Sequence, residues 1–138
     1  MKKTKTFVTL ALVSLLAASG LQASQEKKQQ RLKVMHTYAG ALHMVQDGFL
    51  YNNKTKILNG AKTLHDTARE VLGHDMQSHL PKNQEYTYKF AKKITERVLV
   101  HADGITDATK RANPLEAMDE FNYVIKQCTS CHLRVRSW

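Results

Sequence analysis

The chain has 138 residues, of which 42% are hydrophobic and 24% are charged, and it contains only 6 Gly and 2 Pro. This length suits a single compact domain, and the composition excludes a disordered or collagen-like chain. Because residues that interrupt helices are scarce, the composition favours an all-α fold.

The first 23 residues have the features of a secretory signal peptide. Three lysines precede a run over residues 7–18 that is apolar except for Thr9 and Ser14, and small residues follow it. A membrane-spanning helix needs about 20 apolar residues, and this run is shorter. We therefore expect a signal peptide at residues 1–23, cleaved after Ala23 or just before Leu21, and a mature periplasmic domain at residues 24–138.

The mature domain remains basic after this segment is removed. It has 18 Lys and Arg against 12 Asp and Glu, a net charge of +6. An exported protein seldom meets nucleic acid, so this charge indicates an acidic protein partner or an anionic membrane surface. The alternative is a solvated basic surface that has no specific partner.

Four segments carry apolar residues at spacings of three and four, the period of an amphipathic helix. They cover residues 25–51, 57–73, 86–112 and 114–135. The stripe of the first segment consists of Leu32, Met35, Tyr38, Ala39, Leu42, Val45 and Phe49, and that of the last segment includes Leu115, Met118, Phe121, Val124, Ile125 and Cys128.

Polar and turn-forming residues separate these segments. Asn113 and Pro114 form a strong helix start, with Asn as the N-cap and Pro at the first helical position. Residues 74–83 lose the apolar period and predict a loop, and Asp103 with Gly104 is a weak point in the third segment. Four helices joined by short connections predict an all-α, antiparallel, up-down-up-down four-helix bundle.

Near the end of the last segment stands the sequence Cys128-Thr129-Ser130-Cys131-His132. Two thiols three residues apart lie on one face of a helix, where each can add to a vinyl group of one haem, and the next residue offers an imidazole to the iron. A thioredoxin-like pair would need a βαβ context, a disulfide at this spacing closes too small a loop to stabilise a fold much, and a zinc site needs further thiols. The motif predicts one haem c, held by thioethers to Cys128 and Cys131 near the C-terminal end of the fourth helix, with His132 as an iron ligand.

A signal peptide, four predicted helices and a single Cys-x-x-Cys-His close to the C-terminus resemble the cytochrome c′ family, over the whole mature chain. After the histidine, that family commonly has two variable residues and then Phe-Arg. Here Val135 and Arg136 stand at those positions, so the arginine matches and the aromatic residue does not. Members of the family often dimerise through their first two helices, so the resemblance also allows a homodimer.

The group on the other side of the iron decides the function. In an antiparallel bundle the start of the first helix lies beside the end of the fourth, and a rise of about 1.5 Å per residue puts His132 roughly 9 Å and Met35 roughly 15 Å from that end. Met35 also lies in the apolar stripe. Residues 31–35 resemble the low-spin members of the family, in which a methionine of the first helix binds iron. We therefore predict His132 and Met35 as the two iron ligands.

Other ligands stay open from the sequence. His36 would need only a modest rotation of the first helix to reach the iron. His74, Met76 and His79 lie in the predicted loop that returns to the same end of the bundle. If one of these residues binds the iron, Met35 is only a core residue of the apolar stripe.

These residues predict an electron carrier and not an enzyme. With His132 and Met35 both bound, little rearrangement would accompany the electron, and a thioether ligand favours the reduced state. Arg136 or Arg134 would pair with a haem propionate or face a docking protein, unless they are simply solvated. The expected partners are redox proteins with an acidic docking face, and not nucleic acid. The alternative is a five-coordinate haem protein in which Met35 only walls a dry pocket for NO or CO, serving gas binding or detoxification.

Overall fold

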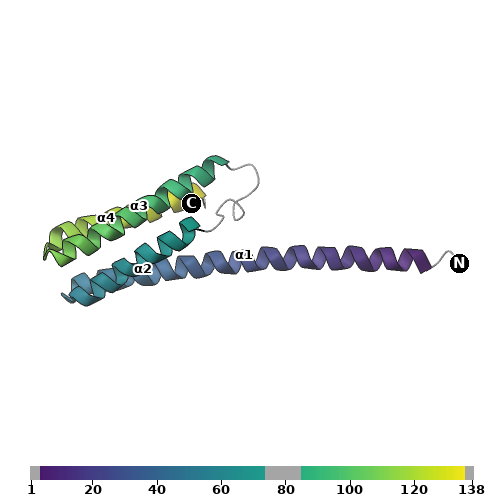
Figure 1. Cartoon of the computed structure of the whole chain (residues 1–138), viewed down its shortest axis with the longest axis horizontal. Coiled ribbons are helices and arrows are strands. Elements are labelled where there is room, and N and C mark those ends of the chain that lie inside the picture. Colours follow the sequence, from purple (N-terminus) through teal and green to yellow (C-terminus); the bar gives the residue numbers. More distant parts are fainter. Residues whose placement is uncertain (1–3, 74–84, 136–138) are drawn as a thin grey trace. The chain divides into compact units, whose positions relative to one another are not determined.

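A computed structural model describes the backbone of residues 4–73 and 85–135 and the side chains of residues 25–73 and 86–134. Four helices make up nearly all of this part of the chain (Figure 1): α1, Thr4–Leu50; α2, Lys54–Gly73; α3, Glu85–Lys110; and α4, Pro114–Val135. No strand occurs among these residues. The predicted all-α class and the four predicted helices are therefore confirmed.

The first helix is longer than the sequence pattern predicted. It begins at Thr4 and continues without a break past Ala23, the expected cleavage position, to Leu50. The chain divides after Lys33 into two compact units, and the second unit contains the rest of α1 together with α2, α3 and α4. The loop predicted at residues 74–83 lies outside the described residues. In the part of the chain that the structure describes, no helix combines the length and apolar character required to span a membrane.

The connection between α1 and α2 is a compact turn closed by backbone hydrogen bonds. Asn53 N donates to Gly48 O at 2.7 Å, and Asn52 N donates to Phe49 O at 3.3 Å. Asn52 has a φ of 49°, the left-handed conformation that a Schellman cap requires and that Asn tolerates better than most residues. The side chain of Asn53 then caps α2, because its Oδ1 accepts a hydrogen bond from Lys56 N at 2.9 Å.

The connection between α3 and α4 repeats this pattern. Asn113 N donates to Ala108 O at 2.9 Å, and Ala112 N donates to Thr109 O at 3.2 Å. Ala112 takes the left-handed position with a φ of 57°, which costs a residue with a Cβ roughly 1–2 kcal/mol. Asn113 caps α4, since its Oδ1 accepts from Glu116 N at 3.3 Å and its Nδ2 donates to Glu116 Oε2 at 2.8 Å. The predicted start of α4 is therefore confirmed.

The core of the second unit is made of small and branched apolar side chains from all four helices, with α3 packed against both α2 and α4. Its buried cluster comprises Ala41, Val45, Ile57, Ala61, Leu64, Ala68, Val98, Ala102, Ile105, Phe121 and Val124. The predicted stripes differ from the buried faces at several positions. On α1, Ala41 is buried and Ala39 is exposed. On α4, Leu115 and Met118 are 79% and 36% exposed because the buried face there begins with Ala117.

The backbones of α1 and α2 approach so closely that only glycine fits at their contact. A Cβ atom on Gly60 would lie 2.6 Å from Val45 Cγ2 and 2.9 Å from Ala41 O. A Cβ atom on Gly48 would lie 2.8 Å from Ile57 N. Non-bonded heavy atoms reach their optimal separation at about 3.5–4.0 Å, so neither contact could hold even one more methyl group.

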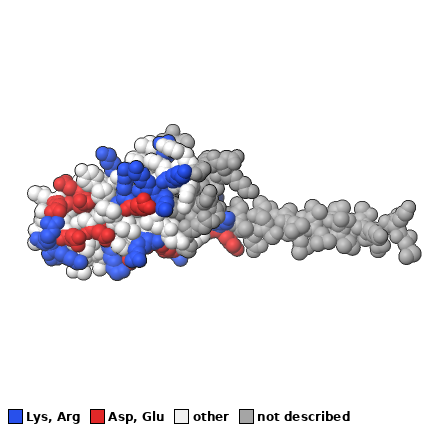
Figure 2. Space-filling model, turned by 45° about the horizontal axis from the view of Figure 1, so that its top comes forward, with Lys and Arg blue, Asp and Glu red and all other residues white. Residues whose placement is uncertain are grey.

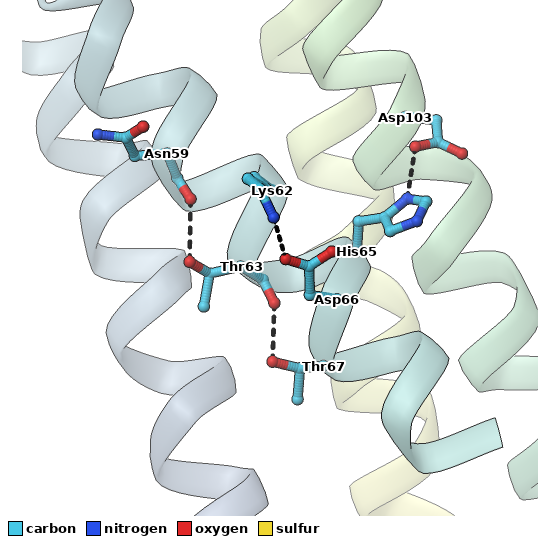
Figure 3. Close-up of polar contacts among 7 residues, drawn as sticks. All are labelled: Asn59, Lys62, Thr63, His65, Asp66, Thr67 and Asp103. Carbon is cyan, nitrogen blue, oxygen red and sulfur yellow. Dashed lines mark hydrogen bonds and ion pairs between the residues drawn. The ribbon is translucent and has the colours of Figure 1, made fainter. Parts of the chain in front are cut away.

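Two histidine–carboxylate pairs link neighbouring helices. His65 Nδ1 of α2 lies 2.6 Å from Asp103 Oδ1 of α3 (Figure 3). His101 Nδ1 of α3 lies 2.7 Å from Glu120 Oε2 of α4. Gly104 leaves room for that carboxylate, because a Cβ atom there would lie 2.7 Å from Glu120 Cδ. α3 runs through Gly104 without a break, so the predicted weak point does not interrupt the helix.

Candidate functional site

The last turns of α4 carry both predicted attachment cysteines and the predicted histidine ligand. Cys128, Cys131 and His132 are all half-buried, and both cysteines are in the thiol form. The two residues between the cysteines turn their hydroxyl groups back to the helix. Thr129 Oγ1 and Ser130 Oγ each donate to the carbonyl four residues earlier, at 3.0 and 2.7 Å. The thiols and the imidazole are therefore the reactive groups that this segment offers.

The two thiols lie in an environment built by three helices. The side chain of Cys128 packs against the core cluster, and burial, followed by the neighbouring Cys131, raises the pKa of the Cys128 thiol to about 11. The phenol of Tyr38 in α1 shares this environment. Burial, followed by the negative charges of the two thiols and of Glu70 in α2, raises the pKa of Tyr38 well above its usual range. Tyr38 is thus an α1 residue that interacts electrostatically with both cysteines.

This burial predicts slow alkylation of Cys128 in the folded, haem-free protein. Because the pKa rises from 9.0 to about 11, the sulfur keeps its proton, and at pH 8 the reactive thiolate should be about 100-fold rarer than in the unfolded chain. The rate should also keep increasing with pH up to about 11 instead of levelling off near 9. Peptide mapping after iodoacetamide treatment, with and without denaturant, measures both rates at Cys128. Equal rates in the two states would contradict the buried position of this thiol.

Met35, the predicted second iron ligand, lies on α1 one turn before Tyr38. Its exposed fraction is 36%, so it occupies the edge of the buried face of α1 and not the centre that the stripe suggested. Tyr38 packs against the core cluster as a half-buried side chain, and Met35 is not among the side chains that do so. His36 is also exposed. Sequence reasoning missed Tyr38 as a site residue, although its position three residues after Met35 in the same stripe was a usable signal.

Arg134 contacts two aromatic rings of α3. Its guanidinium carbon lies 4.5 Å from the centre of the Tyr86 ring and 4.9 Å from that of the Phe90 ring, within the range of a cation–π interaction. This contact puts the start of α3 beside the end of α4. Arg136, which matches the family pattern, lies outside the described residues, and so do the three alternative loop ligands, His74, Met76 and His79.

An apolar groove of about 360 Å³ opens between α1 and α4, away from the thiols. It is lined by Gln46, Phe49, Leu50, Met118, Phe121 and Ile125. On α1 these residues begin two turns after Tyr38, and on α4 they end before Cys128. The groove is therefore separate from the environment of the two thiols.

Compared with known proteins, the chain matches no family model, no curated protein and no solved structure. The chemistry of the donor set is then the test of whether haem fits. Two half-buried thiols three residues apart on one helix, with an imidazole on the next residue, suit covalent attachment and ligation of one haem.

Proposed function

We propose that this chain is a periplasmic, mono-haem c-type cytochrome of the cytochrome c′ kind, which carries single electrons between redox proteins and is not an enzyme. The observation that supports this most is the position of Cys128, Cys131 and His132, all half-buried at the end of one helix. Bound haem supplies a one-electron Fe(III)/Fe(II) couple. The sulfurs of Cys128 and Cys131 would hold it covalently to α4, and the ring of His132 would offer a nitrogen ligand. Arg136 is proposed as the partner of a propionate.

The proposed helix order is antiparallel, up-down-up-down, with the haem near the end of α4. Three contacts support it. Lys54 Nζ, at the start of α2, donates to Lys110 O, at the end of α3, at 3.5 Å. The Arg134 guanidinium packs on rings at the start of α3. The phenol of Tyr38 shares the environment of the thiols of α4.

We further propose that Met35 and His132 would be the two protein ligands of the iron. Tyr38 shares the electrostatic environment of the thiol pair, and in antiparallel helices three residues back along α1 correspond to about three residues onward along α4. Met35 would thus lie at the level of His132. Because the methionine side chain has three rotatable bonds, two of which set the position of its sulfur, Met35 can turn inward from the edge of the buried face. A methionine ligand would favour the reduced state.

A gas-binding haem protein is the second candidate function, and the 36% exposure of Met35 favours it. If Met35 stays at the edge of the buried face, the iron keeps one open position. The apolar residues around Tyr38 would then exclude water and anions while admitting NO or CO. The two functions therefore differ in the position of a single thioether.

The visible absorption spectrum of the haem-loaded protein tests the proposal. Electron transfer through His132 and Met35 predicts a weak band at about 695 nm in the oxidised form, the position expected for methionine ligation, and no response of the reduced form to CO. High-spin spectra with rapid CO binding would overturn the electron-carrier proposal in favour of gas binding. If the protein purified from the periplasm carried no covalently bound haem, both proposed functions would be contradicted.

A further inference from the structure

The charges on α3 and α4 are divided along the bundle. Residues 86–100 and 125–135, at the end that carries the cysteines, have six Lys and Arg against one acid, Glu96. Residues 101–124, toward the other end, have five Asp and Glu against two bases. The excess positive charge of α3 and α4 is therefore concentrated at the end where haem is proposed to bind.

Four basic residues of α3 make up most of this excess: Lys89, Lys92, Lys93 and Arg97, which we call the α3 basic face. All four are exposed. Figure 2 shows a group of Lys and Arg side chains in the upper middle of the visible surface and further ones at its left and lower edges. Within the described part of the chain, no ion pair joins Lys92, Lys93 or Arg97 to an acid.

The spacing of these residues works against the helix that carries them. Lys93 and Arg97 are four residues apart, and like charges at this spacing destabilise a helix. Some charged residues elsewhere in the described part of the chain are paired, as in Lys56 with Asp47 at 2.7 Å and Arg111 with Glu116 at 2.6 Å. Like charges that lower the stability of their own helix indicate that these residues serve to bind another molecule and not to stabilise the fold.

We propose that the α3 basic face is the docking surface for an acidic electron-transfer protein, an inference that rests on the proposed function. The stacking of Arg134 on Tyr86 and Phe90 joins the start of this face to the end of α4, two residues beyond His132. Docking there brings a partner to the haem end of the bundle, and the acidic opposite end turns away from it.

An acidic protein fits this surface better than an anionic membrane does. Membrane-bound helices combine a basic face with a broad apolar face that enters the lipid, whereas the opposite face of α3 is buried in the bundle through Ala91, Ile94 and Val98. Binding lipid through the haem end would also block the access that a protein partner needs.

The test compares two double variants of the full haem-loaded chain that lose the same charge. Lys93→Gln/Arg97→Gln alters the α3 basic face, and Lys54→Gln/Lys110→Gln alters the opposite end. Stopped-flow oxidation by the hexacyanoferrate(III) anion should slow about fivefold in the first variant at an ionic strength of about 10 mM, and less than about twofold in the second. Oxidation by the tris(phenanthroline)cobalt(III) cation should instead become faster in the first variant. Both variants should keep the parent's midpoint potential.

Retention on a carboxylate column gives a readout that does not depend on haem. The α3 variant should elute earlier than the control variant although their net charges are equal. Equal retention and equal rate changes in the two variants would overturn the docking surface. Co-sedimentation of the parent with phosphatidylglycerol and phosphatidylcholine vesicles, lost only in the α3 variant, would overturn the protein partner in favour of a membrane. Failure to bind haem would contradict the proposed function, while the column comparison would still decide the surface.

Discussion

Replacing Gly60 with alanine is expected to lower the free energy of unfolding by about 2–3 kcal/mol, the cost typical of overpacking a dense core. The new methyl group would lie 2.6 Å from Val45 Cγ2 and 2.9 Å from both Ala41 O and Val45 N. Two of these three atoms belong to the backbone of α1, so no side-chain rotation can relieve the contact. The helices would have to separate, and apolar side chains next to the contact would lose their packing.

Gly40→Ala is the matched control for this prediction. It adds the same methyl group to α1, but nothing lies within 4 Å of the added atom. Alanine favours a helix over glycine by up to about 1 kcal/mol, so this variant should be slightly more stable than the parent. Urea unfolding followed by circular dichroism compares the two variants. If Gly60→Ala unfolded at the same urea concentration as Gly40→Ala, the close approach of α1 and α2 would be wrong.

Replacing Met35 with leucine should change the haem-loaded protein from one that ignores CO to one that binds it stoichiometrically. Leucine keeps the volume of the side chain but has no sulfur to donate to iron, so the sixth position would open. The band expected at about 695 nm should disappear from the oxidised spectrum. Absorption spectroscopy of the oxidised form and of the reduced form with CO measures both effects.

Met44→Leu provides the control because it removes a thioether from the same helix nine residues further along. Roughly 13 Å separates the two positions along the helix axis, so Met44→Leu should leave the spectrum of the parent unchanged. If both variants kept the parent spectrum, Met35 would not be the ligand, and His36 would be the next residue to replace.

Much of the helical architecture could be predicted from the sequence because its signals are local. The spacing of apolar residues located the helices, and the Asn113–Pro114 pair fixed the start of α4 to the residue. The two cysteines were also predicted to lie near the end of the fourth helix, and α4 ends at Val135, a few residues after them. These features depend only on neighbours within a few residues.

The features that escaped prediction depend on contacts between helices. A spacing of three and four fits two adjacent faces equally well, so the sequence could not tell that Ala41 is buried and Ala39 exposed. Tyr38 became a site residue only because α1 brings it to the thiols of α4. The stacking of Arg134 on Tyr86 likewise depends on where α3 begins relative to the end of α4.

The repeated turn has a consequence for the order in which the molecule assembles. Each turn joins two successive helices through hydrogen bonds between residues no more than five positions apart, so each helical hairpin can form early, at a low cost in chain entropy. Tyr38 belongs to the first hairpin and both thiols to the second. Until the hairpins join, the first hairpin cannot contribute to the burial that raises the pKa of the Cys128 thiol. We therefore expect the proposed thioethers to form fastest before the two hairpins dock. The attached haem would then form part of the surface against which the hairpins pack.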